Sequence, residues 1–233
     1  MSTTGRVSAI INCAGKGTRF GSNKLLAIVG GRTVLERTVQ HFDHPQIDEV
    51  VVTVSKEHAA TYRAILDEAT SLPITYAMGD SERHLSAKNG LDATTGDLIV
   101  VHDGVRPFLT ADLIDRVIDA ARDHDAAMLA LPSTVQVKLV SEDGFVDDSL
   151  ERSRSWLGQT PHVFCRELLE RAYAAAIRDG YTRTSDDADL VAEYCGVRAK
   201  VVPGHPNNIK ITTPQDQGTA NFIADELARM DER

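Results

Sequence analysis

The sequence predicts an α/β fold in which a mainly parallel, twisted sheet is flanked by helices on both sides. Short apolar runs alternate with amphipathic segments along nearly all 233 residues, as in chains built from βα units. Runs such as Ile99-Val100-Val101 are apolar without alternation, which is typical of strands buried on both faces. Because the chain contains no internal repeat, low-complexity tract or linker, we expect a single domain over residues 1–233.

The expected elements follow from local periodicity. Short apolar or β-branched runs predict strands at Val7–Asn12, Glu49–Ser55, Ile74–Met78, Leu98–His102, Ala127–Leu131, His162–Phe164 and Lys200–Val202. Between them, apolar residues recur at helical spacing, which predicts helices at Val34–Phe42, Glu57–Ala69, Ser86–Ala93, Ala111–His124, Arg166–Arg178, Asp187–Tyr194 and Gln215–Met230.

One segment departs from this rhythm and predicts a protruding β-hairpin at residues 133–154. Val135–Val140 alternates polar and apolar residues, Ser141-Glu142-Asp143-Gly144 has the composition of a turn, and Phe145–Asp148 suits a return strand. A hairpin that leaves a parallel sheet has edges to cover, and a second subunit is a common way to cover them. We therefore expect a dimerisation arm; the alternative is a hairpin folded onto its own domain.

Composition excludes several classes of protein. With 42% hydrophobic and 25% charged residues, the chain is neither disordered nor a coiled coil. Its 25 basic and 34 acidic residues give a net charge of −9, so we expect no general binding to nucleic acid. A small anionic ligand would need a local gathering of cations.

The chain shows no sign of export or membrane insertion. No apolar run approaches the roughly 20 residues of a membrane helix, and the start lacks the apolar stretch of a signal peptide. Cys13, Cys165 and Cys195 are widely spaced and odd in number, as expected for reduced thiols. We expect a cytoplasmic protein with no membrane partner.

The first strand leads into a glycine-rich loop, Cys13-Ala14-Gly15-Lys16-Gly17-Thr18-Arg19-Phe20-Gly21, followed by Lys24. Glycines at the carboxyl end of the first strand let backbone N–H groups approach an anion closely. The loop is neither a Walker A motif nor a dinucleotide fingerprint, since Phe20 replaces the third glycine. Three cations within nine residues, Lys16, Arg19 and Lys24, nevertheless favour a di- or triphosphate over a simple turn.

Two later loops also follow strands. Gly79-Asp80-Ser81-Glu82-Arg83-His84-Leu85-Ser86 precedes a helix, so Ser86 could cap that helix or read the edge of a base. Asp103 ends a central strand, where open sheets bind ligands. It could hold a metal, accept a hydroxyl or pair with Arg106. Arg152, which lies eight residues before Thr160, and Lys210 could be solvated surface charges.

In order, these segments resemble the sugar-alcohol-phosphate cytidylyltransferases from Ile10 to about Ala220. The motifs that carry the resemblance are A-G-x-G-x-R, E-R-x-x-S, H-D-x-x-R-P, Q-T-P with its upstream Arg, S/T-D-D and N-I-K-I-T-T-P-x-D. The resemblance implies a fold of the nucleotidyltransferase type and a cytidylyltransferase that joins CTP to a sugar-alcohol phosphate and releases pyrophosphate. It further implies Mg²⁺ held mainly by the CTP phosphates, with no dedicated protein metal site, and a homodimer formed through the arm.

The resemblance also implies roles for individual residues. The residues expected to take part in catalysis are Arg19, Lys24, Arg152 and Lys210. CTP is expected to contact Ala14, Gly15, Lys16, Gly17, Thr18, Gly79, Ser81, Arg83, Ser86 and Asp103. The polyol phosphate is expected to contact Asp103, Arg106, Thr134, Arg152, Thr160, Ser185 and Lys210.

Trp156 and Glu193-Tyr194-Cys195-Gly196 favour the branch that acts on 2-C-methyl-D-erythritol 4-phosphate in non-mevalonate isoprenoid synthesis, which we predict here. The ribitol 5-phosphate branch is the alternative, because Gly158–Pro161 and Val105–Thr110 match it equally. The chain departs from the pattern at Cys13, at Asp80 and in the arm at Ser133–Gln136. These departures leave room for a non-catalytic nucleotide sensor. A sugar-1-phosphate enzyme using UTP or GTP fits the motifs less well.

Overall fold

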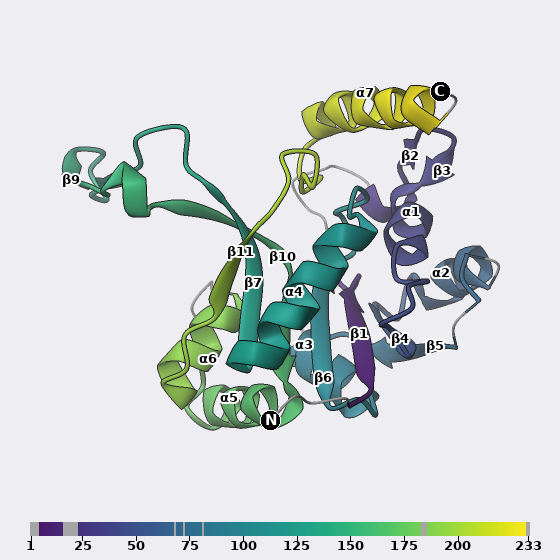
Figure 1. Cartoon of the computed structure of the whole chain (residues 1–233), viewed down its shortest axis with the longest axis horizontal. Coiled ribbons are helices and arrows are strands. Elements are labelled where there is room, and N and C mark those ends of the chain that lie inside the picture. The colour runs from purple at the N-terminus through teal and green to yellow at the C-terminus, as the bar shows by residue number, and fades with distance from the viewer. Residues whose placement is uncertain are drawn as a thin grey trace.

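The computed structural model describes residues 5–15, 23–67, 69–71, 73–80, 82–182 and 186–231. Its centre is a seven-stranded sheet with the order β11-β7-β10-β6-β1-β4-β5, drawn in Figure 1. The strands are β1 Val7–Asn12, β4 Glu49–Val54, β5 Ile74–Met78, β6 Leu98–Asp103, β7 Ala126–Pro132, β10 Trp156–Cys165 and β11 Lys200–Pro203. The predicted α/β class, mainly parallel with flanking helices, is confirmed.

One strand runs against the others. β10 pairs antiparallel with both β6 and β7, whereas β1, β4, β5, β6, β7 and β11 share one direction. Pairing shifts register between Gln159 and His162, around the cis peptide bond between Thr160 and Pro161. Because β10 ends where β6 begins, its middle part lies beside the carboxyl end of β6. This arrangement brings the Q-T-P segment to the edge where the parallel strands end.

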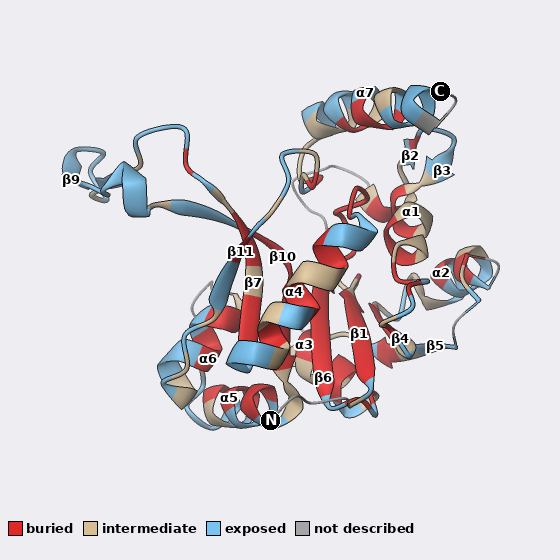
Figure 2. Cartoon of the chain, in the orientation of Figure 1, coloured by how far each residue is buried: buried red, intermediate tan, exposed pale blue. Residues whose placement is uncertain are grey.

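Helices cover both faces of the sheet. They are α1 Val34–Gln40, α2 Ala59–Leu66, α3 Arg83–Asp92, α4 Ala111–His124, α5 Arg166–Arg178, α6 Asp187–Cys195 and α7 Pro214–Asp231. One buried cluster joins the sheet to α1, α2, α4 and α7, and the other joins it to α3, α5 and α6. Figure 2 shows the central strands almost wholly buried between these layers. No helix in the described ranges combines the length and apolarity that a membrane span needs.

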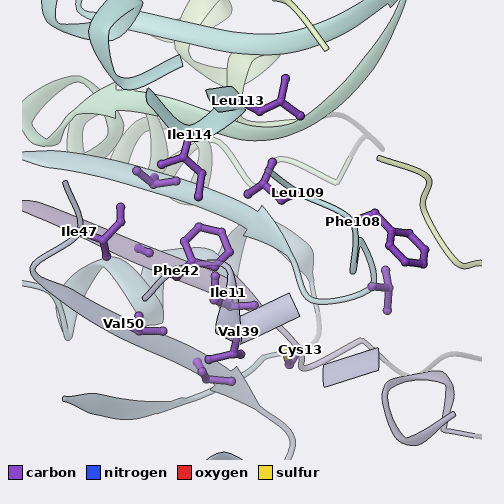
Figure 3. Close-up of a cluster of buried hydrophobic side chains, with 14 of the residues drawn as sticks. Ile11, Cys13, Val39, Phe42, Ile47, Val50, Phe108, Leu109, Leu113 and Ile114 are labelled. Atoms are coloured by element: carbon purple, nitrogen blue, oxygen red, sulfur yellow. The ribbon is translucent and has the colours of Figure 1, made fainter. Parts of the chain in front are cut away.

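Alternation along β1 assigns each side chain to one of the two faces. Ile11 and Cys13 belong to the cluster with α1 and α4, where Figure 3 shows them near Val39 and Phe42. Ile10 belongs to the opposite cluster. There the α-carbon of Gly90 approaches so closely that an added Cβ would lie 2.6 Å from Ile10 Cγ2. α3 therefore packs tightly under the end of β1, with its first turn at the carboxyl edge of the sheet.

The predicted hairpin is present and projects from the body of the domain (Figure 1). Its first strand, β8 Lys138–Val140, is shorter than expected, and its second strand, β9 Val146–Ser149, is shifted by one residue from the expected range. The turn closes through a hydrogen bond from Ser141 N to Phe145 O, with Gly144 at a φ of 89°. Nearly all of its residues are exposed (Figure 2). A short 3-10 turn, η3 at Arg152–Arg154, leads back to the sheet.

Several boundaries differ from the sequence prediction. β10 begins at Trp156 rather than His162, because its first half pairs with β7 although Gly158 and Pro161 weaken the strand pattern. α3 begins at Arg83, three residues before the predicted start. A small hairpin, β2 Ile28–Val29 and β3 Arg32–Thr33, was not expected; Gly30 and Gly31, both at positive φ, form its turn.

Candidate active site

Two cavities open at the carboxyl edge of the sheet and share one wall. The first, of about 250 Å³, is lined by the ends of β1, β4 and β6 and by the first turn of α3. The second, of about 230 Å³, is lined by β10 and by the start of α6. Arg83, Asp103 and Lys210 line both cavities. Two bound molecules would therefore meet at these three charged side chains.

Asp103 is the centre of this wall. Its carboxylate accepts a hydrogen bond of 2.8 Å from Lys210 Nζ, and Arg106 Nε and Arg83 Nη2 lie 3.5 and 3.9 Å from it. Burial alone would raise the pKa of Asp103, but the three cations hold it well below its usual range. The carboxylate is therefore ionised and holds the cations together. Lys210, whose side chain is 41% exposed, is the cation of this group most open to a ligand.

Arg83 is anchored from the opposite side by Asp187. The guanidinium donates two hydrogen bonds of 2.9 Å, one to each carboxylate oxygen of Asp187, in the bidentate geometry that fixes an arginine in one orientation. Tyr173 donates a third bond of 2.7 Å to the same carboxylate. Asp187 is fully buried in the first turn of α6. Burial would raise its pKa, but Arg83 and His162 lower it, so Asp187 is a buried anion.

The loop that carries Lys210 is fastened to β10 by side-chain hydrogen bonds. Asn208 Nδ2 donates to the carbonyl of Thr160 over 2.9 Å, and Gln159 Nε2 donates to the carbonyls of His205 and Asn208. Arg106 Nη1 donates to the Asn208 carbonyl over 2.8 Å. The Q-T-P and N-I-K segments thus have a structural role: together they place Lys210 against Asp103.

Thr160 belongs to a closed hydrogen-bond chain. Its hydroxyl oxygen accepts from the backbone N–H of Asp103 over 3.1 Å and lies 3.0 Å from His102 Nδ1. His102 Nε2 lies 3.2 Å from the carbonyl of Arg106. A carbonyl only accepts, so Nε2 carries the proton and Nδ1 accepts from Thr160. The Thr160 hydroxyl therefore orients Asp103; its predicted contact with the polyol phosphate stays a prediction.

The free energy of unfolding is expected to decrease as the pH is lowered from 7 to 5, because of His102. Burial lowers the pKa of His102 to about 3, from an ordinary value of 6.5. Between these values the unfolded chain binds a proton that the folded chain does not, so the unfolding equilibrium shifts by up to about tenfold per pH unit. Urea unfolding between pH 7 and 5 measures this slope. His102→Gln should make the slope smaller, leaving the part due to His41, whose pKa burial also lowers, whereas the exposed His124→Gln should leave it unchanged. Equal slopes in all three proteins would refute the assignment.

Lys24 lines the first cavity from a short 3-10 turn, η2 at Lys24–Leu26. Asn23 caps the turn, because its side chain accepts from Leu25 N over 3.1 Å, and its Nδ2 donates to Tyr62 Oη over 2.9 Å. Leu25 is buried in the core beside Cys13. Two lysines separated by 186 positions, Lys24 and Lys210, consequently face one cavity.

The loop after β5 forms the far end of the first cavity. Ser86 Oγ accepts a hydrogen bond of 2.9 Å from the backbone N–H of Asp80 and lies 3.1 Å from the carbonyl of Glu82. Ser86 thus holds the loop in shape. Gly79 packs directly on the glycine-rich segment, since an added Cβ would lie 2.1 Å from Ala14 Cβ.

A methyl group at Gly79 is expected to disturb the first cavity. Gly79→Ala must separate the two loops, so we expect the KM for the nucleotide to rise about tenfold or more, as the backbone donors move out of position. Steady-state kinetics at saturating second substrate measure this change. Gly218→Ala is the matched control, because the added methyl meets nothing within 4 Å and alanine favours the helix α7. An unchanged KM in Gly79→Ala would contradict the close approach.

The structure brings together many of the predicted site residues. The two cavities are lined by Ala14, Gly15, Lys24, Arg83, Ser86, Asp103, Arg106, Thr160 and Lys210, and Gly79 lines the adjoining opening with Lys24. Thr134 and Arg152 are exposed on the arm and line neither cavity. Lys16, Gly17, Thr18, Arg19, Ser81 and Ser185 lie outside the described residues. Their roles stay predictions.

Sequence reasoning overlooked two residues of the site. Asp187 was noted only within the S-D-D motif, and its pairing with Arg83 spans 104 positions. Asn12 was counted as the end of the first strand, yet its side chain lines the first cavity. The position of Asn12 was the available signal, because this polar residue ends a buried strand directly before the glycine-rich loop.

The fold, and two cavities that share the charged wall of Arg83, Asp103 and Lys210, suit a transferase that joins a nucleotide to a second anionic substrate. Comparison with known proteins agrees. The family model described as IspD, 2-C-methyl-D-erythritol 4-phosphate cytidylyltransferase, matches residues 7–226. The protein of that name from Syntrophus aciditrophicus is 39% identical, over 97% of this chain and 99% of its own length. The one from Symbiobacterium thermophilum is 40% identical, over 96% of this chain and 94% of its own length.

Solved structures lead to the same family. The 4-diphosphocytidyl-2C-methyl-D-erythritol synthase from Anaerococcus prevotii superimposes with a TM-score of 0.84 at 32% identity, covering 94% of this chain and 96% of its own. The 2-C-methyl-D-erythritol 4-phosphate cytidylyltransferase from Thermus thermophilus gives 0.78 at 32% identity, covering 94% and 99%. The chain belongs to the 2-C-methyl-D-erythritol 4-phosphate cytidylyltransferase family. The predicted class of enzyme, a CTP-dependent nucleotidyltransferase of the erythritol branch, is confirmed.

Proposed function

We propose that the first cavity holds CTP, that the second holds 2-C-methyl-D-erythritol 4-phosphate, and that the reaction takes place at the wall between them. The observation that supports this proposal is the presence of Arg83, Asp103 and Lys210 in the lining of both cavities. Cytosine lies at the end of the first cavity that Asp80 and Ser86 line, beside Gly79 in the adjoining opening. The α-phosphate of CTP lies near Lys24 and Lys210, and the phosphate of the acceptor lies near Arg106 and Lys210.

The reaction needs positioning and positive charge rather than a strong base. The phosphate oxygen of the acceptor is already ionised near pH 7, since the second pKa of a phosphate monoester is about 6. It attacks the α-phosphorus of CTP, a new P–O bond forms, and the bond to pyrophosphate breaks. Negative charge accumulates on the phosphate oxygens, where Lys24 and Lys210 stabilise it. Asp103 orients Lys210 until a phosphate replaces it as the partner.

Magnesium fits this site as an ion carried by the triphosphate. Within the described ranges no three His, Cys, Asp or Glu side chains converge to hold a metal. Asp103 supplies one carboxylate at the wall, where its Oδ1 lies 3.9 Å from Arg83 Nη2 and its Oδ2 lies 2.8 Å from Lys210 Nζ. Asp103 would therefore hold the ion together with phosphate oxygens. Bound magnesium would neutralise phosphate charge and ease the loss of pyrophosphate.

The arm is proposed to join two copies of the chain. Val135, Val140, Phe145 and Val146 are apolar side chains that are more than half exposed on it, an unusual concentration for a surface that stays free. Next to them, Val137, Leu150, Trp156 and Leu157 line an apolar groove at the base of the arm. In a dimer, Thr134 and Arg152 of one copy would reach the acceptor cavity of the other.

We further propose that the enzyme works in the cytoplasm, where CTP is made.

Sedimentation velocity tests the arm. The unmodified chain is expected to sediment at twice its mass of 25.4 kDa at micromolar concentration, and Phe145→Asp combined with Val146→Asp is expected to sediment as a monomer. Phe222→Asp is the matched control, because Phe222 is 65% exposed on α7, away from the arm. Monomeric unmodified protein would contradict the proposed dimer.

Pyrophosphate release tests the proposed function. With CTP and Mg²⁺, the enzyme should release pyrophosphate with 2-C-methyl-D-erythritol 4-phosphate and at least 100-fold more slowly with ribitol 5-phosphate. Release with ribitol 5-phosphate alone would move the acceptor to the other branch. Binding of CTP without release in either case would support a nucleotide sensor instead.

A further inference from the structure

Asn12 carries two polar atoms that no described residue satisfies. Both its Nδ2 and its Oδ1 are shielded from solvent and have no hydrogen-bond partner in the part of the chain that the structure describes. A carboxamide left in this state costs free energy unless something else supplies the missing hydrogen bonds. Because Asn12 lines the first cavity, a bound molecule can supply them.

The register of the sheet places Asn12 in the middle of the cavity. Asn12 pairs with Thr53 of β4 on one side and with Asp103 of β6 on the other. It follows Ile10 by two positions, so it faces the same side as Ile10, toward α3. The side chain thus lies above the first turn of α3, where Arg83 and Ser86 line the same cavity.

Its neighbours already have partners. Thr53 Oγ1 accepts from the backbone N–H of Cys13 over 3.1 Å, Asp103 is paired with Lys210, and Ser86 is bonded to its own loop. Among these four side chains in the lining of the first cavity, Asn12 is therefore the one whose hydrogen-bonding groups are still available to a bound molecule. It offers one acceptor and two donor hydrogens.

The order of strands indicates which part of a nucleotide lies over Asn12. The loop at Gly79, proposed for the base, follows β5, and the reacting wall at Asp103 follows β6. β1 lies between them, separated from β5 by β4 alone and directly beside β6. The part of CTP that joins the base to the α-phosphate is the ribose, so the ribose must cross the end of β1.

We propose that Asn12 is a specificity-determining residue that binds the ribose hydroxyls of CTP and selects a ribonucleotide over a deoxyribonucleotide. Its Oδ1 accepts a hydrogen bond from one hydroxyl of the diol, and its Nδ2 donates to the other. Without a hydroxyl, one of these buried groups stays unpaired, which is how a polar site rejects an analogue that lacks a hydrogen-bonding group. This inference rests on the proposed placement of CTP in the first cavity.

The test compares nucleotides within each protein variant. We expect kcat/KM of the unmodified enzyme to be about tenfold or more higher for CTP than for 2′-deoxy-CTP or 3′-deoxy-CTP, the effect of losing about one buried hydrogen bond. Asn12→Leu keeps the size of the side chain but removes both polar groups. In this variant, kcat/KM for CTP should exceed kcat/KM for the affected deoxy analogue by no more than about threefold. Thr53→Val, next to Asn12 in the same cavity, should keep the ratio.

The ratio is internal to each variant, so a lower fraction of folded enzyme does not change it. An unchanged CTP to deoxy-CTP ratio in Asn12→Leu would overturn the proposal. A loss of selectivity between CTP and UTP instead would also overturn it, because Asn12 would then read the base. Calorimetric binding of CTP, 2′-deoxy-CTP, 3′-deoxy-CTP and UTP without acceptor gives the same comparison even if turnover fails, so the inference and the proposed reaction are judged separately.

Discussion

Replacing Lys210 by methionine is expected to lower kcat at least about 100-fold. The substitution keeps most of the stem and removes the ammonium group that lies 2.8 Å from Asp103 and lines both cavities. Loss of one donor that stabilises charge in the transition state costs about 10²–10³ in kcat. Because Asn208 and Gln159 hold the loop independently of Lys210, the protein should remain folded.

Single-turnover kinetics at saturating CTP and acceptor measure this effect. Lys200→Met is the matched control, because Lys200 lies exposed on β11 and lines neither cavity. Its kcat should change less than twofold. A loss smaller than threefold in Lys210→Met would remove Lys210 from the proposed chemistry, and Lys24 would become the main cation at the α-phosphate.

Asp187→Asn is expected to cause the largest loss of stability. The carboxamide keeps the shape of the side chain but leaves Arg83 without its bidentate anion in a buried position. Breaking a buried ion pair from one side costs about 3–5 kcal/mol, and the lower end applies here because the Arg83 side chain is 34% exposed. Activity should fall as well, since Arg83 lines both cavities.

Urea unfolding near pH 7, combined with kcat/KM, measures both effects. Tyr173→Phe removes one neutral donor from the same carboxylate and should cost about 1 kcal/mol. Asp92→Asn, which breaks an exposed pair with Lys88, should cost less than about 1 kcal/mol. If Asp187→Asn were no less stable than Tyr173→Phe, the Arg83 pair would not be the structural support of the wall.

The fold could be predicted where periodicity determines structure. The predicted bounds of β1, β5, α4 and α5 agree residue for residue with the structure, because the two strands are short runs of mainly apolar or β-branched residues and the two helices each have one clear apolar face. The first half of β10 could not be predicted. Gly158 and Pro161 interrupt the sequence pattern of a strand in this segment. The segment is extended because it pairs with β7.

The site could be predicted only in part, for a related reason. The cations and the glycine-rich loop are visible in the sequence because an acidic chain gathers them in short segments. The hydrogen-bond and ion-pair partners of the site residues are not visible in the sequence. Arg83 and Asp187 are 104 positions apart, and the hydroxyl of Thr160 turns toward His102 across two antiparallel strands. Such contacts follow from the order of strands in the sheet, which local patterns do not specify.

The central claim is that two phosphates meet at the wall of Arg83, Asp103 and Lys210 and react directly. The stereochemical course at phosphorus tests it. With CTP that carries a chiral α-thiophosphate, a single direct displacement inverts the configuration in the product made with 2-C-methyl-D-erythritol 4-phosphate, and inversion is the expected result. Retention would require a covalent nucleotidyl-enzyme and two displacements, and would contradict the account.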